Sequence, residues 1–173
     1  MKERQLSGLD FTIDKLTNSI ENVPWGDNFL TEISLLTTEE LEGITKKNGW
    51  RFNWANDIKV PERDIFKLTI ANNPNIIQGV ISLEVKSDPV YMHLSESAPF
   101  NIGKHKTYFG VPGNLVAFAC KLSFQRGGEG YVSFTAKTKL INHYIESLGA
   151  VHFGGHLMVI TTPAALKLID KYI

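Results

Sequence analysis

One loop in this 173-residue sequence combines residue types that could bind a phosphate group. The segment Gly110–Leu115 (GVPGNL) places glycines directly before a stretch with helical spacing of apolar residues. The first N–H groups of a helix have no partner inside the helix, and the helix dipole favours negative charge at that end. We therefore expect a phosphate-bearing cofactor to bind at Gly110–Leu115.

A second group of residues could move protons, and it lies on a strand predicted over residues 90–98. Strict alternation would place Met92, Leu94, Glu96 and Ala98 on one face and Tyr91, His93, Ser95 and Ser97 on the other. His93 and Glu96 should then point to opposite sides of the sheet.

Glu96 is the preferred candidate for a general base, because a carboxylate is rarely buried on an apolar face without a task or a partner. A structural carboxylate with satisfied hydrogen bonds is an equally good interpretation of Glu96. His93 and Glu84 are the other proton carriers on the central strands.

Other reactive residue types are predicted to be structural. His152 and His156 are separated by the Gly154-Gly155 turn and have no third ligand nearby in the sequence, so we expect no metal site. Cys120 lies on the apolar face of a predicted helix and is interpreted as inert core. The aromatic run from Trp50 to Trp54 could line a pocket mouth or cover a core edge, and the second interpretation is favoured.

The composition indicates an ordinary globular chain. It is 43% hydrophobic, with 18 basic and 18 acidic side chains. We expect one domain over residues 1–173, in which residues 1–28 form an N-terminal extension of uncertain structure. A formal charge of zero gives no reason to expect nucleic acid as a partner, and no apolar run approaches the roughly 20 residues that span a bilayer. The single cysteine and the lack of a secretory signal pattern at the N-terminus favour a cytoplasmic location.

The elements that must position these residues alternate between strands and helices. Strands are predicted over residues 29–36, 66–71, 76–85, 90–98, 131–136, 150–153 and 156–161. Helices are predicted from Thr37 or Thr38 to Asn48 and over residues 115–124, 138–148 and 163–172. The turn over residues 72–75 should make an antiparallel hairpin of the second and third strands.

This order of elements resembles the GCN5-related N-acetyltransferase (GNAT) superfamily from about Phe29 to Ile160. Those enzymes carry an R/Q-x-x-G-x-G/A loop that opens a helix and cradles the pyrophosphate of coenzyme A. In the matching segment here Gly113 meets the pattern, whereas Gly110 replaces the Arg or Gln and Leu115 replaces the small residue.

Two further segments carry the resemblance. The segment HLSESAP, from His93 onward, is similar to the fourth strand of the family. A later family segment has an Asn, then a Tyr, then a Gly-Phe pair. Tyr144 and Gly149 correspond to its Tyr and Gly, while Lys137 stands in place of the Asn and Ala150 in place of the Phe.

The resemblance implies an α+β fold in three layers, with a mixed, mostly antiparallel sheet flanked by helices. It implies an N-acetyltransferase that moves an acetyl group from acetyl-CoA directly to an amine on a small molecule or a protein. The cofactor-binding residues would be Ser97, Ala98, Gly110, Val111, Gly113, Asn114, Leu115 and Lys137. Tyr144 would give a proton to the departing thiolate, although a core aromatic on an amphipathic helix explains it as well.

A second interpretation is a catalytically inactive GNAT-fold module that binds acyl-CoA or a protein partner, because the loop and Lys137 depart from the family pattern. The acceptor site is expected near Trp50–Trp54 and the loop over residues 100–109. The oligomeric state is left open, with a homodimer as one option.

Overall fold

A computed structural model of the chain describes Leu9 and residues 20–173. Most of the predicted N-terminal extension therefore lies outside the described residues. Among the residues that are described, no helix is long and apolar enough to cross a membrane.

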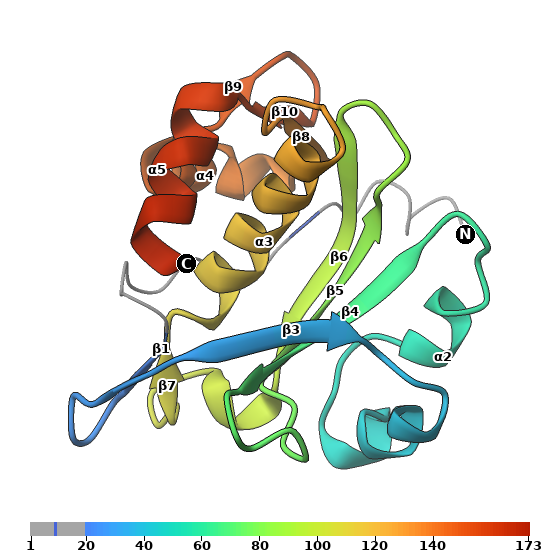
Figure 1. The fold of residues 1–173 in the computed structure, drawn as a ribbon, viewed down its shortest axis with the longest axis vertical. Helices are drawn as coiled ribbons and strands as arrows, with labels where there is room; N and C mark the ends of the chain where they lie inside the picture. Colours follow the sequence, from blue (N-terminus) through green and yellow to red (C-terminus); the bar gives the residue numbers. More distant parts are fainter. Residues whose placement is uncertain (1–8, 10–19) are drawn as a thin grey trace.

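The centre of the structure is a seven-stranded sheet with the order β3-β4-β5-β6-β8-β10-β9 (Figure 1). Its strands are β3 (Thr31–Leu35), β4 (Asp64–Ile70), β5 (Gly79–Glu84), β6 (Val90–Ser97), β8 (Val132–Thr135), β9 (Val151–His152) and β10 (Leu157–Ile160). All neighbours pair antiparallel except β6 and β8, which are parallel. The predicted mixed, mostly antiparallel sheet and its β4–β5 hairpin are confirmed.

Three helices contribute to a large core on one face of this sheet: α3 (Val111–Gln125), α4 (Ile141–Leu148) and α5 (Thr162–Tyr172). A short 3₁₀ turn, η4 (Thr138–Leu140), leads into α4. As predicted, α4 ends at Gly149, whose φ of 71° is the left-handed conformation that glycine adopts at little cost. Together with the turns on the other face, the sheet and these helices make three layers.

The opposite face carries a smaller core. Trp50 and Trp54 are both buried in it, beside Val80 of β5 and Ala98. The aromatic run therefore covers a core, and the alternative of a pocket mouth is not supported for these two rings.

The helix predicted from residue 37 to residue 48 is wrong. The chain forms two 3₁₀ turns instead, η1 (Glu39–Gly43) and η2 (Lys46–Asn48), followed by the four-residue helix α2 (Trp54–Asp57). Thr37 and Glu40 do form the reciprocal cap that starts a helix, with Thr37 N–H donating to the Glu40 carboxylate at 2.9 Å. Leu41 and Ile44 alone give too small an apolar stripe to extend it further.

The predicted faces of β6 are also partly wrong, because His93 is a β-bulge. Leu83 of β5 pairs with Met92, whereas the preceding Ser82 pairs with Leu94, so one extra residue lies in β6. The bulge reverses the alternation: Met92 packs in the core under α3, and Glu96 points to the smaller core on the other face. His93 and Glu96 consequently lie on the same side of the sheet.

A second, three-stranded sheet has the order β2-β1-β7, and the chain runs from its strand β7 into α3. It contains β1 (Ile20–Asn22), β2 (Asn28–Phe29) and β7 (Tyr108–Phe109). The 3₁₀ turn η3 (Pro99–Asn101) and β7 lie within the loop that was predicted to be irregular. This small sheet fixes the chain immediately before Gly110.

Candidate cofactor and catalytic site

Helix α3 begins at the predicted glycine loop. Gly110 has a φ of 94°, which turns the chain from β7 into the helix, and Pro112 occupies the first turn. Asn114 bonds back to the Gly110 carbonyl through its side chain at 2.9 Å and through its N–H at 3.0 Å. Its side-chain oxygen accepts from the hydroxyl of Thr31 at 3.2 Å, which attaches the helix start to the edge strand β3.

The start of α3 has two buried N–H donors that find no acceptor among the described residues. No side chain caps the helix, and Val111 and Gly113 are both buried. In the part of the chain that the structure describes, neither N–H donates a hydrogen bond. Buried backbone donors are nearly always paired, so this pair points to an acceptor other than the described residues. Free N–H groups at a helix start suit an anionic group.

Gly113 also has a packing role that the sequence did not reveal. A Cβ atom there would lie 2.1 Å from Cζ of Tyr172, so the missing side chain lets α5 pack directly against α3. Glycine at this position is therefore required by the fold, whether or not a phosphate binds next to it.

The end of β6 lies beside the start of α3. Ser97 pairs with Gly79 of β5, and a Cβ atom at Gly79 would lie 2.7 Å from Val111 and 3.1 Å from Leu115. The adjacent Ala98 is fully buried and donates its N–H to the Gln78 carbonyl at 2.9 Å. The structure thus brings Ser97 together with Val111 and Leu115, as the predicted cofactor site requires.

Strands β6 and β8 part after three paired residues, ending with Met92 and Phe134. Beyond that point Leu9 pairs with the β8 edge: it donates to the Thr135 carbonyl at 2.6 Å and accepts from Lys137 N–H at 3.3 Å. Since β10 covers the other edge of β8, Leu9 lies in the gap between β6 and β8. Nothing in the local sequence around Leu9 indicated this position.

Tyr144 and Lys137 lie on the far side of this gap. Tyr144 is fully buried in α4, with its ring edge-on to Phe134 of β8 at a centroid distance of 5.3 Å. Lys137 follows the end of β8 and is half-buried. Both are therefore next to the diverging strand β8.

Glu96 has a structural role that accounts for its burial. Its side chain is 4% exposed and accepts three hydrogen bonds: from Arg51 N–H at 2.6 Å, Phe52 N–H at 3.3 Å and Trp54 Nε1 at 2.8 Å. These bonds attach the segment before α2 to the sheet. The structure supports the alternative of a satisfied carboxylate, and a catalytic role for Glu96 stays a prediction.

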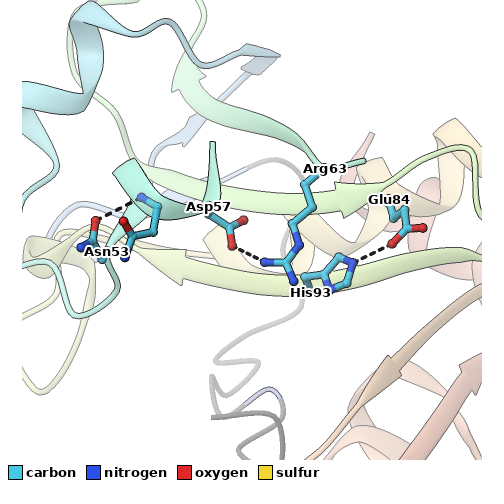
Figure 2. Close-up of polar contacts among 6 residues, drawn as sticks. Asn53, Asp57, Arg63, Glu84 and His93 are labelled. Carbon is cyan, nitrogen blue, oxygen red and sulfur yellow. Dashed lines mark hydrogen bonds and ion pairs between the residues drawn. The ribbon is translucent and has the colours of Figure 1, made fainter. Parts of the chain in front are cut away.

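A polar cluster surrounds His93 on the same face (Figure 2). Its Nε2 lies 3.0 Å from the Glu84 carboxylate, and its ring contacts Tyr91 at a centroid distance of 4.6 Å. Arg63 forms an ion pair with Asp57 of α2 on the other side of the ring (Figure 2). Burial lowers the pKa of His93 below its usual 6.5, the Arg63 guanidinium lowers it further, and the two carboxylates oppose this shift.

The other reactive side chains lie elsewhere. His156 contacts the Ala136 carbonyl through Nδ1, and His152 contacts the Gly155 carbonyl through Nε2. The described residues include no group of three or more His, Cys, Asp or Glu side chains placed to hold a metal ion. Cys120 is buried in α3, and this burial raises the pKa of its thiol to about 12, as befits an inert core residue.

A shallow pocket of about 190 Å³ lies outside the predicted site, where β3 meets α3 and α5. Its lining is largely apolar and consists of Leu30, Thr31, Ile33, Phe118, Lys121, Tyr172 and Ile173. None of the predicted site residues lines it.

Comparison with known proteins finds similarity in structure alone. No protein-family model and no curated protein match the sequence. The chain is similar to the spermidine/spermine N-acetyltransferase SpeG of Vibrio cholerae, with 17% identity over 79% of this chain and 95% of that one, at a TM-score of 0.52. A structure of the spermidine N-acetyltransferase of the same organism in complex with CoA and spermine matches with 15% identity over 79% and 98% of the two chains, at a TM-score of 0.50. Identities this low show the fold alone.

Proposed function

Because this chain has the fold of the GNAT acetyltransferases, we propose that it is an N-acetyltransferase that uses acetyl-CoA and transfers the acetyl group directly to an amine. The observation that carries the proposal is the start of α3, where two buried N–H donors beside the end of β6 have no acceptor in the described part of the chain. A solved structure with this fold contains CoA and spermine, which supports the choice of cosubstrate.

The chain's own residues would hold the cosubstrate in two places. The N–H groups of Val111 and Gly113 would donate to its phosphates, while Gly110, Asn114 and Leu115 fix the shape of the turn. The main chain at Ser97 and Ala98 and the half-buried Lys137 would contact the rest of the molecule across the gap between β6 and β8. When bound, acetyl-CoA supplies an acetyl group activated as a thioester.

Tyr144 would act as the acid. Its phenol lies in a buried site next to β8, and a hydroxyl held near the gap can give its proton to a departing thiolate. Tyr144→Phe should then reduce kcat while leaving the Kd for acetyl-CoA within about twofold of the unmutated chain.

The decisive experiment is calorimetric titration of the chain with acetyl-CoA, followed by a screen of polyamines, amino acids and peptides for acetylation. Binding at micromolar concentration with turnover of at least one amine supports the proposal. A variant that tests the loop is Gly110→Ala. It strains a backbone at φ 94° and should weaken binding of acetyl-CoA through the geometry of the turn. Absence of binding at millimolar acetyl-CoA would overturn the proposal.

Binding without turnover of any amine would favour the inactive module that binds acyl-CoA. The acceptor in either case would be an amine on a small molecule or a protein.

A further inference from the structure

The cluster around His93 has the composition of a proton-accepting site, and it lies where β6 leaves β8. His93 is the bulged residue directly after Met92, the last residue of β6 that pairs with β8. It is 20% exposed and its partner Glu84 is 35% exposed, so solvent reaches both. Glu96, by contrast, is enclosed by three donors.

We propose that His93, positioned by Glu84, is the general base that takes the proton of the acceptor amine, and that the acceptor binds on this face of β5 and β6. This inference rests on the proposed acetyltransferase function and goes beyond it by assigning the base and the acceptor face.

The contact with Glu84 selects the useful tautomer. A carboxylate only accepts hydrogen bonds, so a neutral imidazole must donate from Nε2 and keep its lone pair on Nδ1. The structure gives Nδ1 no partner among the described residues. Tyr91 packs against the ring, and its hydroxyl is 2.6 Å from that of Thr135 on β8, which holds the imidazole near the closed end of the gap. A base with a free, oriented acceptor atom is therefore available there.

The charges around His93 favour a cationic acceptor, while burial favours the neutral form of the ring. Two carboxylates, Glu84 and Asp57, face His93 together with one guanidinium, that of Arg63, which leaves the cluster with one net negative charge (Figure 2). The Oδ2 atom of Asp57 is buried and has no partner among the described residues. A protonated amine is attracted to such a cluster, where it can lose a proton to become a nucleophile.

The distances along β6 agree with this assignment. Ser97 is the fourth residue after His93, and a strand rises about 3.3 Å per residue, so the base lies about 13 Å from the end of β6 that adjoins α3. An extended pantetheine arm can bridge such a span. The thioester would then lie near His93, at the closed end of the gap.

Each proton that moves in the proposed step has a named donor and acceptor. The protonated amine first gives one proton to Nδ1 of His93, which passes it to water. The neutral nitrogen then bonds to the acetyl carbon and gives its second proton to Nδ1, while the carbon–sulfur bond breaks and the thiolate takes the proton of Tyr144. His93 then passes its proton to water, and Tyr144 regains one from water.

The first test needs no reaction. Nitrogen-15 NMR of the histidines in the full chain, with the His93 signal assigned from His93→Gln, should show the Nε2–H tautomer and a titration midpoint below 6.5. Glu84→Gln should move this midpoint down, since Glu84 favours the protonated ring, and Arg63→Gln should move it up. An Nδ1–H tautomer, or a midpoint that neither variant moves, would overturn the assignment.

The second test is kinetic. His93→Gln should lower kcat about 10²–10⁴-fold and leave the calorimetric Kd for acetyl-CoA within twofold, whereas His152→Gln, on exposed β9, should leave both unchanged. The acid limb of the kcat/KM profile should follow the NMR midpoint in the Glu84 and Arg63 variants. Full turnover by His93→Gln would overturn this inference alone, whereas a chain that binds no acetyl-CoA would overturn the proposed function and this inference with it.

Discussion

A buried carboxylate can look catalytic in a sequence and be structural in the fold, and Glu96 illustrates why. Its neighbours on β6 are apolar, which makes its position unusual. The donors that satisfy it come from Arg51, Phe52 and Trp54, and the nearest of them is 42 residues away in the sequence. Only the folded chain brings donors and acceptor together.

The consequence for stability can be measured. Glu96→Gln replaces one of two acceptor oxygens by an amide NH₂ that faces N–H donors, so we expect the free energy of unfolding to fall by about 1–3 kcal/mol. Denaturant unfolding would measure it, with the exposed Glu146→Gln as control, which should stay within about 0.5 kcal/mol of the unmutated chain. A stable Glu96→Gln chain that has lost its rate would instead support the original prediction of a catalytic base.

A second prediction about a single residue concerns Gly113. Gly113→Ala would place a methyl group on the ring of Tyr172, and we expect a loss of about 1–3 kcal/mol in the free energy of unfolding. Gly43→Ala is the matched control, because a Cβ atom there meets no other atom within 4 Å. Adding Tyr172→Ala to Gly113→Ala should make the two losses clearly non-additive. Additive losses would show that the ring is not what excludes a side chain at this position.

At the scale of elements, the sequence predicted the parts that depend on local pattern. Strands β4, β5 and β6, helices α3 and α5, and the stop of α4 at Gly149 were all expected from spacing, turns and caps. The bulge at His93 was not expected, because one extra residue leaves no trace in the composition. It nevertheless moves every side chain that follows it in β6 to the opposite face of the sheet. The pairing of Leu9 with β8 was missed for a related reason, since its partners Thr135 and Lys137 lie more than a hundred residues away.

That pairing leads to a prediction about the element β8. Leu9 uses the same edge of β8 that an arm of acetyl-CoA would approach in the gap. Saturating acetyl-CoA should therefore speed hydrogen exchange at the Leu9 amide at least about tenfold, through local opening of this edge. The Ala136 amide is the control, because it donates to His156 on the β10 side and should not change. An unchanged Leu9 amide with acetyl-CoA bound would mean that Leu9 and the ligand share the gap.

The whole molecule separates the proposed tasks between the two faces of its sheet. The donors at the start of α3 and the phenol of Tyr144 lie on the face with the large core, whereas His93 and Glu96 lie on the face with the smaller one. The gap between β6 and β8 connects the two faces. An acid on one side of the gap and a base on the other is the arrangement that an acetyl transfer across it requires.

Two titratable groups, His93 and Glu40, should make the stability of the molecule depend on pH in two separate ranges. Burial and Arg63 hold the pKa of His93 below 6.5, so the unfolded chain binds more protons than the folded chain below that pH. The stability that neutral His93 preserves is complete above pH 6.5 and is lost as the pH falls through its folded pKa. Glu40 affects stability at lower pH. Burial alone would raise the pKa of its carboxyl, but the hydrogen bonds from Lys67 and Thr37 together hold this pKa below 4.5.

Urea unfolding at a series of pH values would resolve the two ranges, because variants remove them one at a time. His93→Gln should flatten the part of the fall in the free energy of unfolding that begins as the pH drops below 6.5, and leave the part that begins below pH 4.5 in place. Lys67→Met should do the reverse, since it removes the partner that favours the ionised form of Glu40. If His93→Gln changed only the acidic range, the folded pKa of His93 would not be depressed, and the neutral base proposed on this face would lose its support.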